Sequence, residues 1–189
     1  MNTQHELMHY AKLYRGVVSD EICDQTVKEM DTLEFQEHNF YNPVTKTNAP
    51  RSGSKELAMS FGNTSTKKTL NNLVDDTAYR YVQDLNMPWF NQYQGYTHVR
   101  FNKYAENKQM ALHCDHIQSM FDGERRGIPI LSVLGILNDD YEGGEFYLID
   151  EKTDLSKGDI IIFPSNFMYP HKVEPVTKGT RYSYISWTW

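Results

Sequence analysis

The second half of the chain is built from short strand-like runs separated by turn residues, and this pattern constrains the fold most strongly. The runs occur at Tyr96–Phe101, Leu131–Leu137, Glu145–Ile149, Asp159–Phe163, His171–Val173 and Tyr182–Trp187. Short strands separated by Gly, Pro and Asn are typical of an all-β sandwich or barrel. A high aromatic content, 13% of the chain, also favours β structure. We therefore expect a mainly β fold.

The first half has two segments with helical patterns. Ser19 precedes Asp20 and Glu21, and apolar residues then recur as far as Met30. A serine hydroxyl accepts from the free amide groups of a helix start, and acidic side chains favour its positive end. Thr69–Leu85 has apolar residues at helical spacing. The sequence thus predicts two helices packed on a β core.

Residues 36–68 form a third kind of segment, rich in Asn, Pro, Thr, Ser, Gly and Lys and without clear periodicity. A connection of this length without secondary structure is uncommon in a compact domain, and such loops are often lids or binding loops. The alternative interpretation is a surface excursion. Both remain open at this stage.

The length of 189 residues fits a single domain. We expect residues 1–95 to supply helical support and a long loop, and residues 96–189 to form the β core. The net charge of −6 disfavours nucleic acid as a partner, since phosphate binding needs a basic surface. No signal peptide or run of 18 apolar residues occurs, so we expect a cytoplasmic protein without membrane contact. Nothing in the sequence indicates an oligomeric state.

Three residues suggest a metal site. His113 and Asp115 are two positions apart, so in a strand their side chains point to the same face. His171 begins another predicted strand 56 positions after Asp115. Two imidazoles and one carboxylate leave three coordination positions open, as non-heme Fe(II) oxygenases require, whereas zinc favours a tetrahedral site. This combination also occurs by chance, and surface or core histidines are the alternative.

Arg181 adds a second signal, ten positions after His171 on the next predicted strand. If the chain turns back there, the guanidinium reaches the same cavity and forms a bidentate pair with a ligand carboxylate. A buried arginine needs such a partner, because an unpaired buried charge is costly.

A set of spaced motifs makes a family resemblance explicit. The motifs are His113-x-Asp115, Gly143-Gly144-Glu145-Phe146, Lys157-Gly158-Asp159, His171 and Gly179-Thr180-Arg181-Tyr182-Ser183. Over about residues 96–189 the chain resembles the prolyl 4-hydroxylase-like Fe(II)/2-oxoglutarate-dependent dioxygenases. Upstream, Arg51-Ser52-Gly53-Ser54 resembles the Arg-Thr-Ser stretch of that family.

The resemblance implies a double-stranded β-helix, a jelly-roll and cupin-like fold, with Fe(II) held by His113, Asp115 and His171. It further implies that Arg181 binds the 5-carboxylate of the cosubstrate 2-oxoglutarate, with O2 as the second cosubstrate and ascorbate as a further cofactor. The cofactor-pocket residues that it assigns are Tyr104, Ser132 and Trp187. The chain departs from some relatives in having Ile136 where they have a second tyrosine. Asp115 disfavours a halogenase, in which a small residue replaces the carboxylate.

The resemblance suggests hydroxylation of a peptidyl residue, proline first, with the 36–68 loop folded over an extended peptide. Candidate substrate residues are Arg51 in that loop, and Trp89 and Tyr96 before the first strand, although aromatic residues there are more often packing residues. Oxidative dealkylation of a nucleic-acid base is an alternative, but no second arginine follows Arg181 closely. A non-catalytic cupin-like module that binds a metal or a small acid is the other alternative.

Overall fold

The computed structural model describes residues 3–42, 45, 47–49, 55–115 and 129–189. Its helices are α1 (Thr3–Met8), α2 (Asp20–Met30) and α3 (Lys67–Leu85). The strands of the first half are β1 (Lys12–Tyr14), β2 (Gln36–Glu37), β3 (Phe40–Asn42), β4 (Thr47–Ala49) and β5 (Ala58–Ser60). The strands of the second half are β6 (Arg100–Tyr104), β7 (Met110–His113), β8 (Leu131–Ile136), β9 (Glu142–Gly143), β10 (Phe146–Leu148), β11 (Glu151–Thr153), β12 (Ile160–Pro164), β13 (His171–Val173), β14 (Val176–Lys178) and β15 (Arg181–Thr188).

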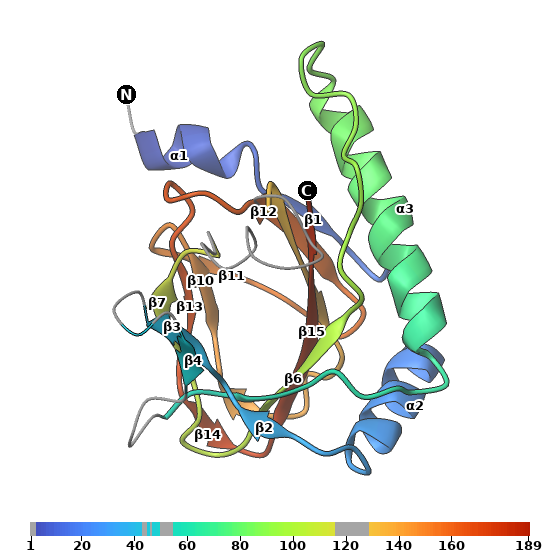
Figure 1. The fold of residues 1–189 in the computed structure, drawn as a ribbon, viewed down its shortest axis with the longest axis vertical. Helices are drawn as coiled ribbons and strands as arrows, with labels where there is room; N and C mark the ends of the chain where they lie inside the picture. The colour runs from blue at the N-terminus through green and yellow to red at the C-terminus, as the bar shows by residue number, and fades with distance from the viewer. Residues whose placement is uncertain (1–2, 43–44, 46, 50–54, 116–128) are drawn as a thin grey trace.

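The two predicted helices are confirmed. Ser19 is the N-cap of α2, and its hydroxyl accepts from the backbone N–H of Ile22 at 3.4 Å. Helix α3 begins at Lys67, two residues before the expected start, and ends where Asn86 adopts a left-handed conformation. Both helices lie on the same side of the β structure (Figure 1). Helix α1 was not expected from the sequence, because its six residues are too short to show periodicity.

Two sheets form the β core. The larger has seven strands in the order β1-β12-β8-β15-β6-β5-β2, and the smaller has four in the order β11-β10-β13-β7. In Figure 1 the smaller sheet lies opposite α2 and α3, with the larger sheet between them. All strand pairings within these two sheets are antiparallel. The mainly β fold class predicted from the sequence is therefore confirmed.

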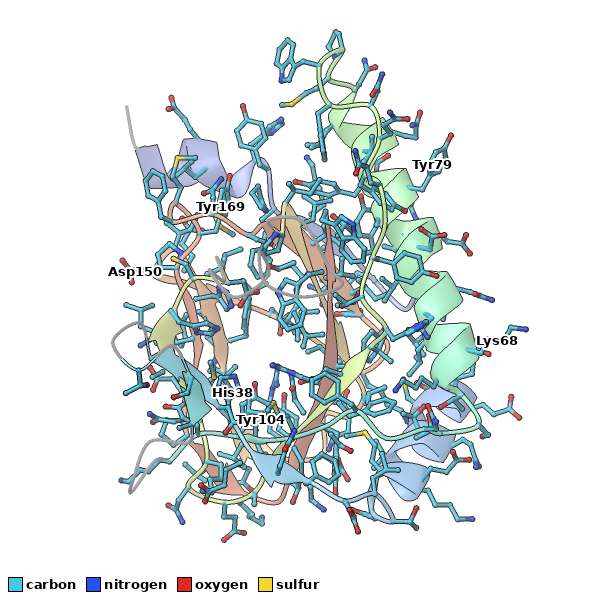
Figure 2. The ribbon with its side chains drawn as sticks, viewed as in Figure 1. His38, Lys68, Tyr79, Tyr104, Asp150 and Tyr169 are labelled. Carbon is cyan, nitrogen blue, oxygen red and sulfur yellow. The ribbon has the colours of Figure 1, made fainter. Side chains whose placement is uncertain are left out.

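Side-chain alternation along the larger sheet creates two apolar cores. One face packs on α2 and α3, and its buried residues include Phe101, Val133 and Tyr184. The other face meets the smaller sheet, with Leu134, Phe163 and Ile185 among its buried residues. The second core surrounds the site described below, and Tyr104 lies in it between the two sheets (Figure 2).

The structure corrects two expectations. The strand expected at Tyr96–Phe101 begins only at Arg100, and Tyr96 forms one isolated bridge with Thr188. Residues 36–68 are not a structureless loop, because β2 to β5 lie within them and α3 begins there. Strand β5 pairs with β6, and buried Met59 anchors it. These strands have two or three residues each, too few for an alternating pattern to be recognised.

Within the described ranges, every helix is too short or too polar to cross a membrane.

Candidate active site

The three predicted metal ligands meet at one point between the two sheets. His113 ends β7 and His171 begins β13, and these residues pair directly across the two strands. Asp115 lies two residues beyond the end of β7, outside the strand in which we expected it. Its Oδ1 atom is 3.3 Å from Nε2 of His113 and 3.5 Å from Nε2 of His171. One ligand atom from each residue lies within 4.8 Å of the others.

Hydrogen bonds behind the triad orient its ligand atoms. The backbone carbonyl of Ala111 lies 2.8 Å from Nδ1 of His113, and that of Tyr169 lies 3.1 Å from Nδ1 of His171. A carbonyl only accepts, so Nδ1 carries a proton in each ring, and Nε2, which faces Asp115, is the ring atom that would bind a metal. Such partners fix the tautomer and ring orientation of metal-binding histidines. The arrangement fits an Fe(II) ion held on one face.

Asp115 is 6% exposed, and its carboxylate contacts the two histidines of the triad and one hydroxyl group. Burial alone would raise the pKa of Asp115, but the charges of the two histidines and hydrogen bonds to them hold it well below its ordinary value. Conversely, burial would lower the pKa of His171, but Asp115 and the Tyr169 carbonyl raise it. Ser132 donates to Oδ2 of Asp115 at 2.7 Å. The site therefore keeps a charged carboxylate ready for a cation.

Arg181 lies at the start of β15 and lines a neighbouring pocket rather than the cavity onto which the triad opens. It is 1% exposed, and its guanidinium carbon is 4.9 Å from the ring centroid of Tyr104, the residue that pairs with it across β6. Its terminal nitrogen donates to Ser183 at 3.2 Å. Its Nε atom is buried without a hydrogen-bond partner among the described residues, and no carboxylate there forms an ion pair with it. A buried guanidinium in this state fits a carboxylate ligand.

The Gly143-Gly144 pair of the family motif makes room for Arg181. Gly144 has a positive φ of 65°, and an added Cβ atom would lie 3.2 Å from Cδ of Arg181. An added Cβ at Gly143 would meet the Pro175 carbonyl at 2.5 Å. Glycine is therefore required here both by the backbone conformation and by the arginine.

A small cavity opens onto the triad. Tyr104 and Trp187, both expected here, line it. Ser132 contacts the carboxylate of Asp115 instead of lining the cavity. Apolar side chains from both sheets complete the wall, namely Leu57, Met110, Leu134, Phe146, Phe163, Val173 and Ile185.

Two polar residues of the lining, Arg100 and Asn102, were missed in the sequence. They lie on β6 and share the inward face with Tyr104, as the register with β15 shows. The two-residue spacing from Tyr104 was the available signal.

The expected substrate residues are not brought to this cavity. Trp89 is 82% exposed and lies beyond the end of α3, and Tyr96 packs against the core between the larger sheet and the helices. Neither lines the cavity. Arg51 lies outside the described residues.

Comparison with known proteins finds one similar family. The sequence model of the 2OG-Fe(II) oxygenase superfamily matches residues 99–189, so this segment is similar to that superfamily. The matched segment contains the whole triad and Arg181.

Similar curated proteins are PKHD-type hydroxylases. One from Idiomarina loihiensis is 36% identical over 93 residues, which cover 47% of this chain and 40% of the relative. PiuC from Pseudomonas aeruginosa is 33% identical over 95 residues, covering 47% of this chain and 41% of that protein. The chain thus spans well under half the length of the curated relatives it matches.

Solved structures show the fold over nearly the whole chain. A prolyl hydroxylase from Trichoplax adhaerens, in complex with a hypoxia inducible factor peptide fragment, has a TM-score of 0.70 at 15% identity and covers 99% of this chain and 89% of its own. The viral collagen prolyl hydroxylase of Paramecium Bursaria Chlorella virus-1 has a TM-score of 0.65 at 13% identity, with 95% of each chain covered. The fold is accordingly the double-stranded β-helix expected from the motifs.

Proposed function

We propose that this chain is an Fe(II)- and 2-oxoglutarate-dependent dioxygenase that hydroxylates a C–H bond of a peptidyl residue, proline first. The observation that carries the proposal is the triad of His113, Asp115 and His171 at one cavity, with the buried, incompletely paired guanidinium of Arg181 at the neighbouring pocket. Residues 96–189 would supply the catalytic core, since they contain all four of these residues.

Each side chain has a distinct task in this proposal. The Nε2 atoms of His113 and His171 and one oxygen of Asp115 would hold Fe(II) on one face and leave the remaining positions for 2-oxoglutarate and O2. When bound, these groups supply the oxidising chemistry, in which 2-oxoglutarate becomes succinate and CO2 and the substrate gains a hydroxyl group. The protein positions the reactants and excludes water.

Arg181 would hold the 5-carboxylate of 2-oxoglutarate, and Tyr104 would border the same ligand. The guanidinium is fixed by Ser183 and by the Tyr104 ring, so it loses little freedom on binding. Ile136 lies on the same inward face and offers no hydrogen bond, which leaves Arg181 as the main partner of that carboxylate.

A peptide substrate is supported by the similarity to prolyl hydroxylases, one of which is described with a bound peptide fragment. The cavity beside the triad is lined mostly by apolar side chains, which suits the aliphatic ring of proline. Incubation of the protein with proline-containing peptides, Fe(II), ascorbate and 2-oxoglutarate, followed by mass spectrometry, tests the substrate. Failure of every peptide to gain oxygen would contradict it.

Conversion of 2-oxoglutarate to succinate tests the enzyme class separately. We expect conversion by the wild type and its loss in Asp115→Ala and His171→Ala. Arg181→Ala should keep the metal but bind 2-oxoglutarate about 2–5 kcal/mol more weakly, because truncating one partner of a buried charge pair is costly. Iron binding with no conversion by any protein would favour the non-catalytic cupin-like module. Unchanged 2-oxoglutarate affinity in Arg181→Ala would place the cosubstrate elsewhere.

A further inference from the structure

Arg100 places a guanidinium in the cavity of the triad, whose lining does not include Arg181. It pairs with Ile185 across β6 and β15, whereas Arg181 pairs with Tyr104 four positions further along. At about 3.3 Å per residue, the two arginine backbones lie about 13 Å apart along the strands. Arg100 is therefore placed toward Trp187 and Asp115, away from the proposed 5-carboxylate pocket.

Neighbouring side chains hold the Arg100 guanidinium in place. Its Nε atom donates to Oδ1 of Asn102 at 3.1 Å, and its central carbon lies 5.1 Å from the ring centroid of Trp187. A guanidinium that stacks on an aromatic face and uses one donor on a neighbour keeps its other donors in a fixed plane. Arg100 is thus oriented before any ligand arrives.

The described residues offer no acceptor to the remaining N–H donors of Arg100. None of the ion pairs among the described residues includes Arg100, and its hydrogen bond to Asn102 uses Nε alone. Trp187 is 8% exposed, lines the same cavity, and has its indole N–H buried without an acceptor in the described ranges. Two neighbouring donors, one of them charged, therefore share a cavity without an acceptor of their own.

Charge balance indicates what could meet them. In the proposed loaded site, the positive charges come from Fe(II) and Arg181. The negative charges come from Asp115 and the two carboxylates of 2-oxoglutarate, and they balance the positive charges. Asp115 is the sole carboxylate of the described cavity lining, while Glu56 lies outside it and accepts from the Ala111 backbone N–H. The charge of Arg100 is then in excess, and a guanidinium is not deprotonated in proteins.

We propose that Arg100, with the indole N–H of Trp187, is a specificity-determining site that binds a carboxylate of the substrate, so that the chain prefers a peptide with an acidic side chain next to the hydroxylated residue. This inference rests on the proposed function and names the substrate class of the same site. A planar guanidinium matches a carboxylate with two parallel hydrogen bonds. The adjacent apolar wall would receive the residue to be hydroxylated.

Binding to the protein loaded with Mn(II) and 2-oxoglutarate tests this inference without turnover. The probes are proline-centred peptides, blocked at both ends, in which one glutamate is moved from position to position and each is matched by a glutamine peptide. We expect the best glutamate peptide to bind wild type about tenfold more tightly than its match, as a charge-assisted pair would give. In Arg100→Gln this ratio should fall to near one, and Arg100→Lys should give an intermediate ratio.

Arg80→Gln is the matched control, because it removes the same charge from the exposed face of α3 and should keep the wild-type ratio. Mn(II) binding and the melting temperature establish that each variant folds. The inference is overturned if wild type prefers no glutamate peptide, or if Arg100→Gln keeps the preference. It is also overturned if Arg100→Gln loses affinity for 2-oxoglutarate, since Arg100 would then serve the cosubstrate. Failure of the proposed function would appear separately, as absence of succinate formation by wild type.

Discussion

At the scale of single residues, the orientation of the Asp115 carboxylate depends on one hydroxyl. Ser132 donates to Oδ2 of Asp115 and also contacts the hydroxyl of Ser165 at 2.7 Å. The other oxygen, Oδ1, faces the two histidines. We predict that Ser132→Ala weakens Mn(II) affinity about 10- to 100-fold, the usual loss when a residue behind a metal ligand is removed. Isothermal titration calorimetry would measure this change.

Ser156→Ala is the control for this prediction, since Ser156 is exposed and remote from the metal ligands in the described structure. It should bind Mn(II) as wild type does. Equal affinities of the Ser132→Ala and wild-type proteins would show that the triad alone orients the carboxylate.

The sequence predicted the triad and Arg181 but not Arg100, and the reason is physical. His113, Asp115 and His171 are residue types whose spacing matches a known coordination chemistry, so a motif identifies them. Arg100 is a charged residue on a strand, and such a residue most often faces solvent. Its even spacing from Tyr104 places it inside, but the expected strand ended at Phe101, before Tyr104, so the shared face was not recognised.

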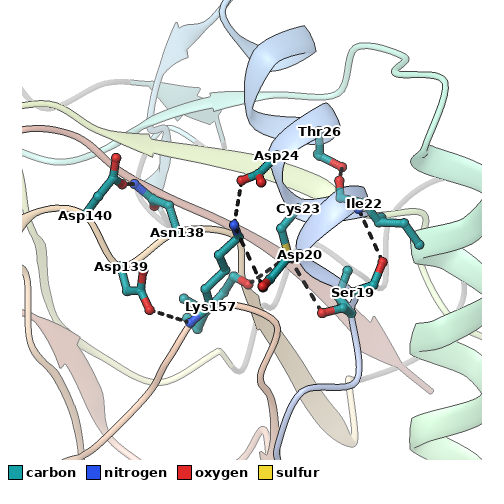
Figure 3. A network of polar contacts seen from close by, with 12 residues as sticks. Ser19, Asp20, Ile22, Cys23, Asp24, Thr26, Asn138, Asp139, Asp140 and Lys157 are labelled. Atoms are coloured by element: carbon teal, nitrogen blue, oxygen red, sulfur yellow. Dashed lines mark hydrogen bonds and ion pairs between the residues drawn. The ribbon is translucent and has the colours of Figure 1, made fainter.

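At the scale of elements, the Lys157-Gly158-Asp159 turn has a structural explanation. Asp159 is 2% exposed and accepts from the backbone N–H groups of Gly16 and Ser156 at 3.0 and 2.9 Å, and from Arg15 at 2.7 Å. It thereby joins the end of β1 to the start of β12. Lys157 reaches Asp24 of α2 at 2.6 Å, a contact visible in Figure 3, but Asp24 is largely exposed.

We predict that these two neighbours contribute very differently to stability. Asp159→Ala leaves backbone donors without their acceptor and should lower the free energy of unfolding by about 1–3 kcal/mol. Lys157→Ala removes a surface ion pair and should lower it by less than about 1 kcal/mol. Urea denaturation followed by circular dichroism gives both values. Equal losses in the two variants would contradict this ranking.

Asp31, at the C-terminal end of α2, connects this helix to the larger sheet through hydrogen bonds that depend on pH. Its carboxylate accepts from the hydroxyl of Tyr182 at 2.6 Å and from Lys103 at 2.9 Å. The Tyr182 hydrogen bond, followed by the Lys103 contact, lowers the pKa of Asp31 from its ordinary value of 3.8. A carboxyl group whose pKa is lowered by folding stabilises the fold above its unfolded pKa, and this contribution is lost as the pH falls through the folded pKa.

We therefore predict that Asp31→Asn is less stable than wild type at neutral pH, and that the difference shrinks as the pH falls below 3.8. Urea denaturation of both proteins across this range would measure it. A difference that stays constant with pH would show that the carboxylate charge plays no part.

Elements were predictable where they were long or fully buried. Strands β8 and β12 are almost wholly buried and read as largely apolar runs, and β15, equally buried, is marked by its aromatic and β-branched residues. Strand β1 has three residues and joins the edge of the larger sheet only through its pairing with β12. Such a strand is defined by its partner, and no local pattern distinguishes it from a loop.

At the scale of the whole molecule, the candidate metal centre exists only once the fold is complete. His113 and Asp115 come from β7 and the residues after it, while His171 comes from β13, and Ser132 behind them belongs to the other sheet. Fifty-six positions separate Asp115 from His171 in the sequence. The unfolded chain therefore does not present the three ligands together.

A ligand that binds only the folded state raises stability by mass action, so metal binding should be visible in unfolding experiments. At free Mn(II) about 100 times its dissociation constant, we predict a gain of about 2.7 kcal/mol in the free energy of unfolding. Addition of 2-oxoglutarate should give a further gain in wild type but little in Arg181→Ala, which keeps the triad and lacks the guanidinium. Asp115→Ala should show neither gain. Chemical denaturation with and without each ligand measures these changes, and an equal Mn(II) effect in wild type and Asp115→Ala would place the bound metal outside the triad.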